Sequence, residues 1–190
     1  MSLVLAPYGM RSAYHPSGVV TRTEQGTINA AAPFIHHGDL VSLAADGTLV
    51  RATPGAGNRL IGVFDGVEYR DGTGRPNVSR CWPAHGGAYD ITAYFTSDPE
   101  LVYEVQANGP VTRDMVGSHA SFVAGVATPA NVMTGVSSDM LDVASVSNAV
   151  VNQLMIIGIR EYPNNVWGDA YTTVLVKIAQ HQRAAALPVY

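Results

Sequence analysis

The stretch Tyr89–Gln106, which reads YDITAYFTSDPELVYEVQ, decides the fold class of this chain. Its first eight residues alternate between an apolar face and a mainly polar face. The apolar face consists of Tyr89, Ile91, Ala93 and Phe95. A period of two is expected of a half-buried β-strand, because successive side chains point to opposite faces. The first part of the stretch therefore predicts a strand over residues 89–96.

A turn and a second strand complete this stretch. Ser97-Asp98-Pro99-Glu100 combines the residue types that favour a tight turn. After the turn, Leu101, Tyr103 and Val105 share one face of a returning strand. The whole stretch thus predicts two consecutive strands that pair across the turn.

Short apolar stretches bounded by turn residues extend the pattern in both directions. Asp46-Gly47 predicts a hairpin between its two flanking strands. Gly62 and Gly66 predict a bulge or a close backbone approach within a longer strand. Single helical turns are predicted over 112–117, with Thr112 as N-cap, and around 139–143. Further strands are predicted over 38–44, 48–51, 60–69, 119–124, 153–160 and 171–179.

Strands at this spacing predict a mainly β chain with a single β-barrel or β-sandwich body. Residues 1–18 contain prolines and glycines together with aromatic and apolar residues, and are predicted to form an extended N-terminal arm that becomes ordered against a partner or the body. The body covers residues 19–182, of which 127–152 are loop-rich. Residues 183–190 form a short C-terminal tail.

The composition narrows the classes of function. The chain has 190 residues, which fits one domain, and 47% apolar residues, which is enough for a core. Only 14% of the residues are charged, so the surface suits a protein that packs against other subunits. The net charge is −4 and no basic run occurs, so direct binding of nucleic acid is not expected.

The single cysteine, Cys81, excludes an internal disulfide and is consistent with a protein made in a reducing cytoplasm. The residues after Met1 lack the charged and apolar regions of a signal peptide. The longest strongly apolar stretch, 154–159, is too short to span a bilayer. Contact with a membrane is therefore not expected.

Histidines and carboxylates are the first candidates for a catalytic or metal site. His36 and His37 are adjacent, so on an extended segment they point to opposite faces and cannot both bind one ion. Either of them with Asp39, and with His85 in a loop, leaves a metal-dependent small-ligand barrel open as an alternative. No nucleophile motif, phosphate-binding loop or metal-ligand spacing occurs. The sequence therefore predicts a protein that is not an enzyme, with no catalytic, cofactor-binding or metal site.

Aromatic and arginine side chains are the candidates for a partner interface, because such residues anchor many protein–protein contacts. For the two tryptophans, a position in the core is the alternative interpretation. The predicted interface residues are Tyr8, Met10, Arg11, Tyr14, Trp82 and Trp167.

The order of several segments along the chain resembles a known family. These segments are Ala6–Arg11 (APYGMR), Gly38–Val41 (GDLV), Ile61–Phe64 (IGVF), Ser97–Glu100 (SDPE), Tyr103–Gln106 (YEVQ), Ser138–Asp142 (SDMLD), Ile156–Ile159 (IIGI) and Val174–Ile178 (VLVKI). The ordered set resembles structural proteins of tailed bacteriophages that occur beside the major capsid protein and are taken to be capsid decoration, or cement, proteins. The resemblance covers about residues 5–182.

This resemblance implies a β-rich virion protein on the outside of an icosahedral phage head, made in the cytoplasm of the bacterial host. Its partners would be the major capsid protein and further copies of itself, with a homotrimer expected before a dimer. Its role would be to cement neighbouring capsid subunits. The alternative within the virion is a head–tail connector, a tail protein or a fibre-base protein.

Overall fold

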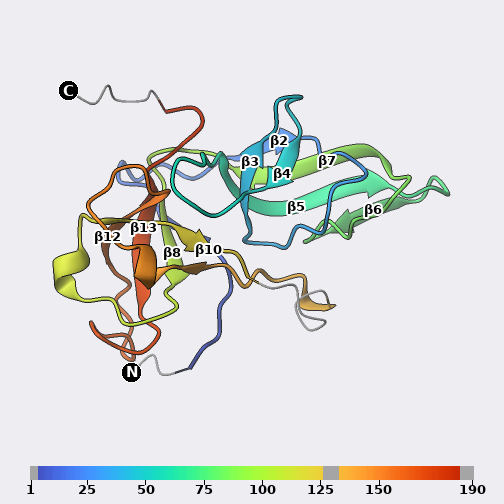
Figure 1. Ribbon diagram of the computed structural model, residues 1–190. Coiled ribbons are helices and arrows are strands. Elements are labelled where there is room, and N and C mark those ends of the chain that lie inside the picture. Colours follow the sequence, from blue (N-terminus) through green and yellow to red (C-terminus); the bar gives the residue numbers. More distant parts are fainter. Residues whose placement is uncertain (1–3, 126–132, 185–190) are drawn as a thin grey trace.

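The computed structural model describes residues 4–125 and 133–184, and these are mainly β. No helix of seven or more residues lies in these ranges. The strands form several antiparallel sheets, which Figure 1 shows as two adjoining lobes. Two single 3-10 turns, η1 (Arg113–Met115) and η2 (Val143–Ser145), lie in the first lobe.

The first lobe is built on a five-stranded sheet. In spatial order its strands are β1 (Arg11–Tyr14), β8 (Val102–Gln106), β13 (Thr173–Ile178), β12 (Leu154–Ile159) and β9 (His119–Ala120). A small sheet of two strands, β10 (Phe122–Val123) and β11 (Met140–Leu141), lies beside it. The strand predicted over 171–179 is present as β13, and its Val174, Val176 and Ile178 side chains are buried in the core of this lobe.

The second lobe is built on a six-stranded sheet. In spatial order its strands are β2 (Thr23–Gly26), β7 (Tyr89–Thr96), β5 (Gly62–Arg70), β3 (Leu40–Leu43) and β4 (Leu49–Arg51), while β6 (Pro76–Ser79) also pairs with β5. The hairpin predicted at Asp46-Gly47 is confirmed, since β3 and β4 pair in antiparallel fashion. Asp46 Oδ1 accepts hydrogen bonds from the Thr48 backbone N–H and hydroxyl, which stabilise this turn.

The two strands of the opening stretch occur as expected, but the pairing predicted between them is wrong. β7 lies between β2 and β5 in the second sheet, whereas β8 lies between β1 and β13 in the first. The turn at Ser97–Glu100 therefore carries the chain from one sheet to the other. Every residue of β8 is buried, because both faces of this strand are covered.

Two other local predictions are also wrong. The strand expected over 119–124 is two strands, β9 and β10, which belong to different sheets. The helical turn expected around 139–143 is the strand β11, and the turn η2 begins only at Val143. The physical reason is local: the Asp142 side chain accepts a hydrogen bond from Ala144 N, which starts the turn after the strand. Thr112 does precede η1, but its side chain makes no capping hydrogen bond.

The chain has two hydrophobic cores, which meet where the lobes join. The second core fills the concave side of the six-stranded sheet. An isolated bridge between Ile28 and Leu49 joins the two ends of this sheet at one point, but no described sheet closes into a barrel. The first core includes Leu40, Leu60 and Val63 from the second lobe, so the two lobes share buried apolar surface.

β5 passes closely over the end of β7 at Gly62, as the sequence predicts. A Cβ atom at this position would lie 1.6 Å from the carbonyl oxygen of Thr96. The predicted bulge is also present, because the β5–β7 register shifts between Phe64 and Gly66. On either side of Gly62, Val63 packs in the first core, whereas Ile61 packs in the second.

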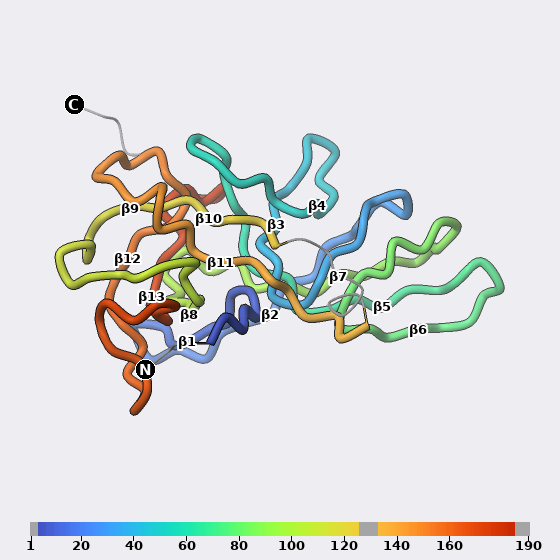
Figure 2. Tube along the Cα trace, turned by 60° about the horizontal axis from the view of Figure 1, so that its bottom comes forward, coloured from blue at the N-terminus to red at the C-terminus, as the bar shows by residue number. Residues whose placement is uncertain are grey.

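The N-terminal residues lie along the body. β1 pairs with β8, and Met10 is only 1% exposed in the first core. Figure 2 shows the N-terminal segment passing from β1 in the first lobe to β2 in the second. Of the predicted C-terminal tail, residues 185–190 lie outside the described residues, and Arg183 forms an ion pair with Glu24.

We expect Gly62→Ala to destabilise the fold, because the added methyl group overlaps the Thr96 carbonyl in the closely packed crossing. The free energy of unfolding should fall by about 3 kcal/mol or more, as for overpacking against backbone. Chemical denaturation measures this loss. Gly158→Ala is the matched control, since that strand glycine has open space around it and should change stability by less than about 1 kcal/mol. Equal effects of the two substitutions would contradict the close approach.

Candidate functional site

The most unusual group of side chains is a buried charge cluster at the junction of the lobes. Arg51 Nη2 lies 2.7 Å from Asp139 Oδ1, and Arg51 Nε lies 3.2 Å from Asp39 Oδ2. The His36 ring approaches the same Asp39 oxygen, with Nδ1 at 3.3 Å. Both carboxylates and the histidine are buried, while the Arg51 side chain is partly exposed. One guanidinium thus lies between two buried carboxylates and compensates only one of their two negative charges.

Three separate segments supply this buried charge cluster. Asp39 directly precedes β3, Arg51 ends β4, and Asp139 directly precedes β11. Arg51 also donates a hydrogen bond to the carbonyl oxygen of Gly125. Asp139 Oδ1 accepts from the Gly125 backbone N–H, so this carboxylate holds together the chain on both sides of residues 126–132. The cluster therefore joins the β3–β4 hairpin of the second lobe to the 137–139 segment.

The N-terminal segment crosses directly beside this cluster. A Cβ atom at Gly9 would lie 2.4 Å from the carbonyl oxygen of Gly38 and 2.5 Å from Ser137 Cβ. Met10 N donates to the same Gly38 oxygen at 2.9 Å. Gly9 has a φ of +74°, a conformation that favours glycine. Only a glycine fits this crossing without moving the segments that carry the two aspartates.

The electrostatics of the cluster are those of two carboxylates with one cation. Burial, and then the charge of Asp39, raise the pKa of Asp139 to about 6, although Arg51 opposes the shift. Asp39 Oδ1 and His36 Nε2 are buried without a hydrogen-bond partner among the described residues. Ser137 Oγ accepts a hydrogen bond from the Asp139 backbone N–H at 3.0 Å. The arrangement binds segments together, and its charge depends on pH.

His36 and His37 point in different directions, as their adjacent positions in the sequence predict. His36 turns toward Asp39, whereas His37 Nδ1 lies 3.0 Å from the carbonyl oxygen of Asp65. His85 lies beside the ring of Tyr69, with centroids 6.0 Å apart, and does not join the cluster. Within residues 4–125 and 133–184, no three histidine, cysteine or acidic side chains gather as metal ligands would.

The predicted interface residues fall into two groups. Tyr14 is 46% exposed, and the exposed Arg11 guanidinium stacks on the Tyr8 ring at 4.2 Å. Trp82 is fully buried, and its Nε1 donates to the carbonyl oxygen of Ala32. With the buried Met10, Trp82 is corrected from an interface residue to a core residue, because neither side chain can reach a partner from this fold. Trp167 is partly buried against the first core.

A second exposed feature follows β1 and was missed by the sequence analysis. Val19 and Val20 are 64% and 84% exposed, between the strand that edges the first sheet and the strand that edges the second. With Tyr14 they form what we call the N-terminal apolar row. The sequence does contain a sign of this feature, because two consecutive valines stand in a segment without strand alternation. A search for strands alone does not identify them.

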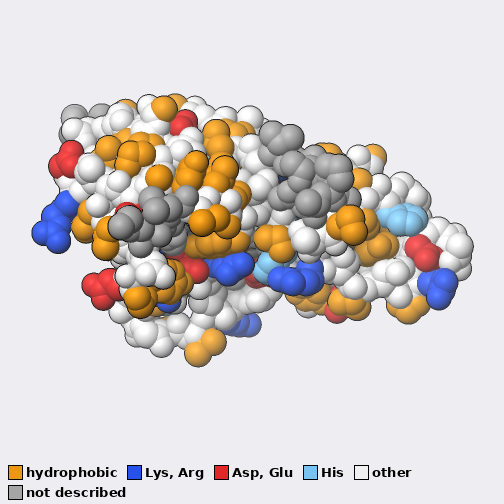
Figure 3. Space-filling model, turned by 90° about the horizontal axis from the view of Figure 1, so that it is seen from below, with side chains coloured by type: hydrophobic (Ala, Val, Ile, Leu, Met, Phe, Trp, Pro, Cys, Tyr) orange, Lys and Arg blue, Asp and Glu red, His pale blue; other side chains and the backbone are white. Residues whose placement is uncertain are grey.

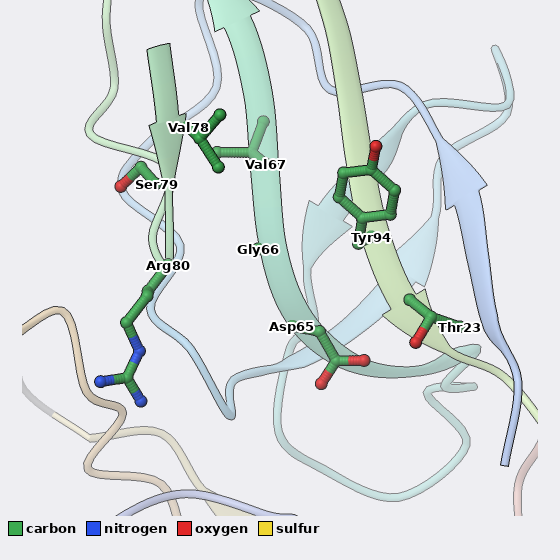
Figure 4. A pocket seen from close by; sticks show the side chains of 8 residues that line it. All are labelled: Thr23, Asp65, Gly66, Val67, Val78, Ser79, Arg80 and Tyr94. Carbon is green, nitrogen blue, oxygen red and sulfur yellow. The ribbon is translucent and has the colours of Figure 1, made fainter. Parts of the chain in front are cut away.

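A shallow hollow of about 460 Å³ lies on the open face of the second sheet (Figure 4). Gly66 forms its floor, since this residue has no side chain, and the Arg80 side chain points away from Asp65 in that view. Burial raises the pKa of Asp65 above its usual value. The hollow is lined by Thr23, Asp65, Gly66, Val67, Val78, Ser79, Arg80 and Tyr94. This set contains no base paired with a nucleophile, so it suits a contact surface better than a reaction.

No family model, curated protein or solved structure matches this chain. None of the helices in residues 4–125 and 133–184 is long and apolar enough to cross a membrane. Figure 3 shows a face on which hydrophobic side chains are common and charged side chains are scattered.

We expect Arg51→Met to destabilise the protein strongly at neutral pH, because it leaves Asp39 and Asp139 buried beside each other without a cation. Removing one partner of a buried ion pair costs about 3–5 kcal/mol. Urea denaturation at pH 7.5 measures the loss. Arg59→Met is the control, since Arg59 is exposed and no ion pair within the described chain involves it. A loss below about 1 kcal/mol for Arg51→Met would contradict the role assigned to the cluster.

We expect Asp139 to make stability fall as the pH rises. Its pKa is raised in the folded chain, so the folded state holds this proton more tightly than the unfolded state between pH 4 and pH 6. Stability from this group is therefore fully present below the unfolded value and lost as the pH rises through about 6. Asp139→Asn should remove this loss. Denaturation of the wild-type protein and of the variant at pH 5 and at pH 7.5 measures how much stability each loses between the two pH values. An identical pH dependence of both proteins would refute the shift.

Proposed function

We propose that this chain is a structural protein of a phage virion, which binds the outer surface of the icosahedral head and cements neighbouring major capsid protein subunits. The family resemblance supplies the identity of the partner. The chain acts by contact, through surfaces held in fixed positions, and transfers no chemical group.

The observation that carries the proposal is the N-terminal apolar row. Tyr14, Val19 and Val20 lie exposed on the segment that edges both sheets, where a partner can reach them. Burying an exposed valine side chain against a partner is favourable by about 1.5–3 kcal/mol. Several such contacts from each copy, repeated over a shell, give binding stronger than any single contact.

Two general features support the same role. Only 14% of the residues are charged, so covering much of the surface requires little desolvation of charge. The Ile28–Leu49 bridge between the two ends of the second sheet favours an incomplete barrel. We therefore propose that the body is a single β-barrel or β-sandwich. A β body of this kind presents its edges and loops at fixed spacing.

The test must leave the core intact. Deleting residues 1–18 would remove Met10 and the edge strand β1, so loss of binding would also follow from unfolding. Substitution of exposed side chains avoids this difficulty. Val19→Asp with Val20→Asp places two charges in the apolar row without touching either core.

We expect the Val19→Asp/Val20→Asp protein to lose occupancy on phage heads by at least about tenfold, since charges at a buried contact are strongly unfavourable. The measurement adds purified protein to heads that lack it and counts bound copies by cryo-electron microscopy. Val150→Asp/Val151→Asp is the matched control, because these are also two consecutive exposed valines, in the first lobe.

Three results would contradict the proposal. Full occupancy by the double variant would reject the apolar row as the contact. Equal loss in the control variant would show an effect of charge alone. Six or twelve copies per particle for the wild-type protein, in place of hundreds, would support the connector alternative.

A further inference from the structure

We propose that β2 is a self-pairing edge: two copies of this chain join by antiparallel pairing of their β2 strands, with Arg22 of each copy opposite Glu24 of the other. This inference does not depend on the capsid role, and it can be tested on the purified chain alone.

β2 is an edge of the second sheet that is uncovered over Thr23–Gln25, since the Ile28–Leu49 bridge closes the sheet only beyond the last residue of β2. It stands at the end of the strand order, and no bridge other than those to β7 involves Thr23, Glu24 or Gln25 in the described chain. Exposed edges carry unpaired backbone N–H and C=O groups, which can add a strand from another chain. β2 contains neither proline nor lysine, the residues that commonly block such pairing.

The edge strands β9, β4, β6 and β1 are covered or interrupted. A bridge from Ser147 covers β9, and a bridge from Ile28 covers β4. β6 begins with Pro76, which has no N–H to donate. A register shift interrupts β1 between Ser12 and Tyr14. β2 is therefore the edge best suited to pair with another strand.

Space is available beside β2. A hollow of about 640 Å³ lies against this strand and is lined by Arg22, Thr23, Glu24, Gln25 and Tyr94. Thr23 and Tyr94 also line the neighbouring hollow at Gly66, so the two hollows adjoin. A strand that approaches this edge would fill the side of the hollow with its own side chains.

The charges of the edge are complementary to themselves. Arg22, Thr23 and Glu24 place one positive and one negative side chain on either side of a neutral centre. In an antiparallel pair centred on Thr23, Arg22 faces Glu24 of the second copy, and the reverse pair forms by symmetry. An unrelated partner would need to present the opposite order, whereas a second copy supplies it automatically.

The two charged side chains are ready for this contact. Arg183 of the same chain lies 2.6 Å from Glu24 Oε2 and holds the carboxylate in place. A carboxylate has enough lone pairs to accept a second guanidinium as well. A hydrogen bond from Ser97 and the contact with Arg183 lower the pKa of Glu24, so it is charged at neutral pH. Arg22 is exposed and makes no ion pair with a described residue.

This geometry favours a two-fold dimer over the trimer that the resemblance implies. A closed ring of three copies joined by strand pairing needs two different open edges on each copy. Among the five edge strands compared above, only β2 is suited to such pairing. When the β2 edge of one copy pairs with the β2 edge of a second copy, both edges are used up, so no third copy can join in the same way.

A charge-swap experiment tests the pairing, with mass in solution measured by sedimentation velocity on the full chain. The wild-type protein should show a reversible monomer–dimer equilibrium. Arg22→Glu alone and Glu24→Arg alone should each raise the dimer dissociation constant by about tenfold or more, because like charges then face each other. An equimolar mixture of the two variants should recover dimers, because each copy now complements the other.

The controls separate pairing from folding. Arg59→Glu makes the same charge change at an exposed site away from the edge and should leave the equilibrium unchanged. Circular dichroism checks that each variant keeps its β structure. A wild-type chain that stays monomeric, a dimer insensitive to both swaps, or a mixture that fails to recover dimers overturns the proposal. None of these results bears on whether the monomer binds phage heads.

Discussion

Two buried carboxylates that share one guanidinium set the constraint on which this structure depends. Asp39 and Asp139 come from segments 100 residues apart in the chain, and Arg51 draws them to the same point. Charges buried this deeply are tolerated only when they are paired. Each of the three segments must therefore lie where its charged side chain meets the oppositely charged one. The shared apolar core, the hydrogen bonds between Gln182 and Leu43, and the Arg183–Glu24 ion pair add further contacts between the lobes.

The chain then crosses this junction repeatedly. β5 supplies side chains to both cores, the turn after β7 leads directly into β8, and the N-terminal segment crosses at Gly9. The close approaches at Gly9 and Gly62 leave no space for a side chain, so these segments cannot separate slightly without losing backbone contacts. Two sheets that would otherwise be linked by a flexible turn therefore behave as one body.

Local patterns in the sequence predicted the longer strands, the Asp46-Gly47 hairpin and the glycine crossing at Gly62, because each depends on neighbouring residues. The short strands β1 and β6 were not predicted, since their segments show no alternation. The separation of β7 and β8 into different sheets could not be predicted, since alternation gives the faces of a strand but not its neighbours in a sheet. Arg51 and Asp139 carried no signal either, because a single charge near a strand end usually lies in solvent. Trp82 had two interpretations, and its burial depends on long-range packing against Ala32 and Tyr69.

The rigid junction also bears on how the chain could act without catalysis. Multivalent binding needs contact surfaces at fixed separations, because freedom between them lowers the effective concentration of the second contact. The N-terminal apolar row and the β2 edge are both attached to the consecutive strands β7 and β8, which the junction holds in place. A buried ion pair contributes little net stability compared with apolar packing, but it does specify one arrangement. For a protein proposed to work by contact alone, a single arrangement of its surfaces is the property that matters most.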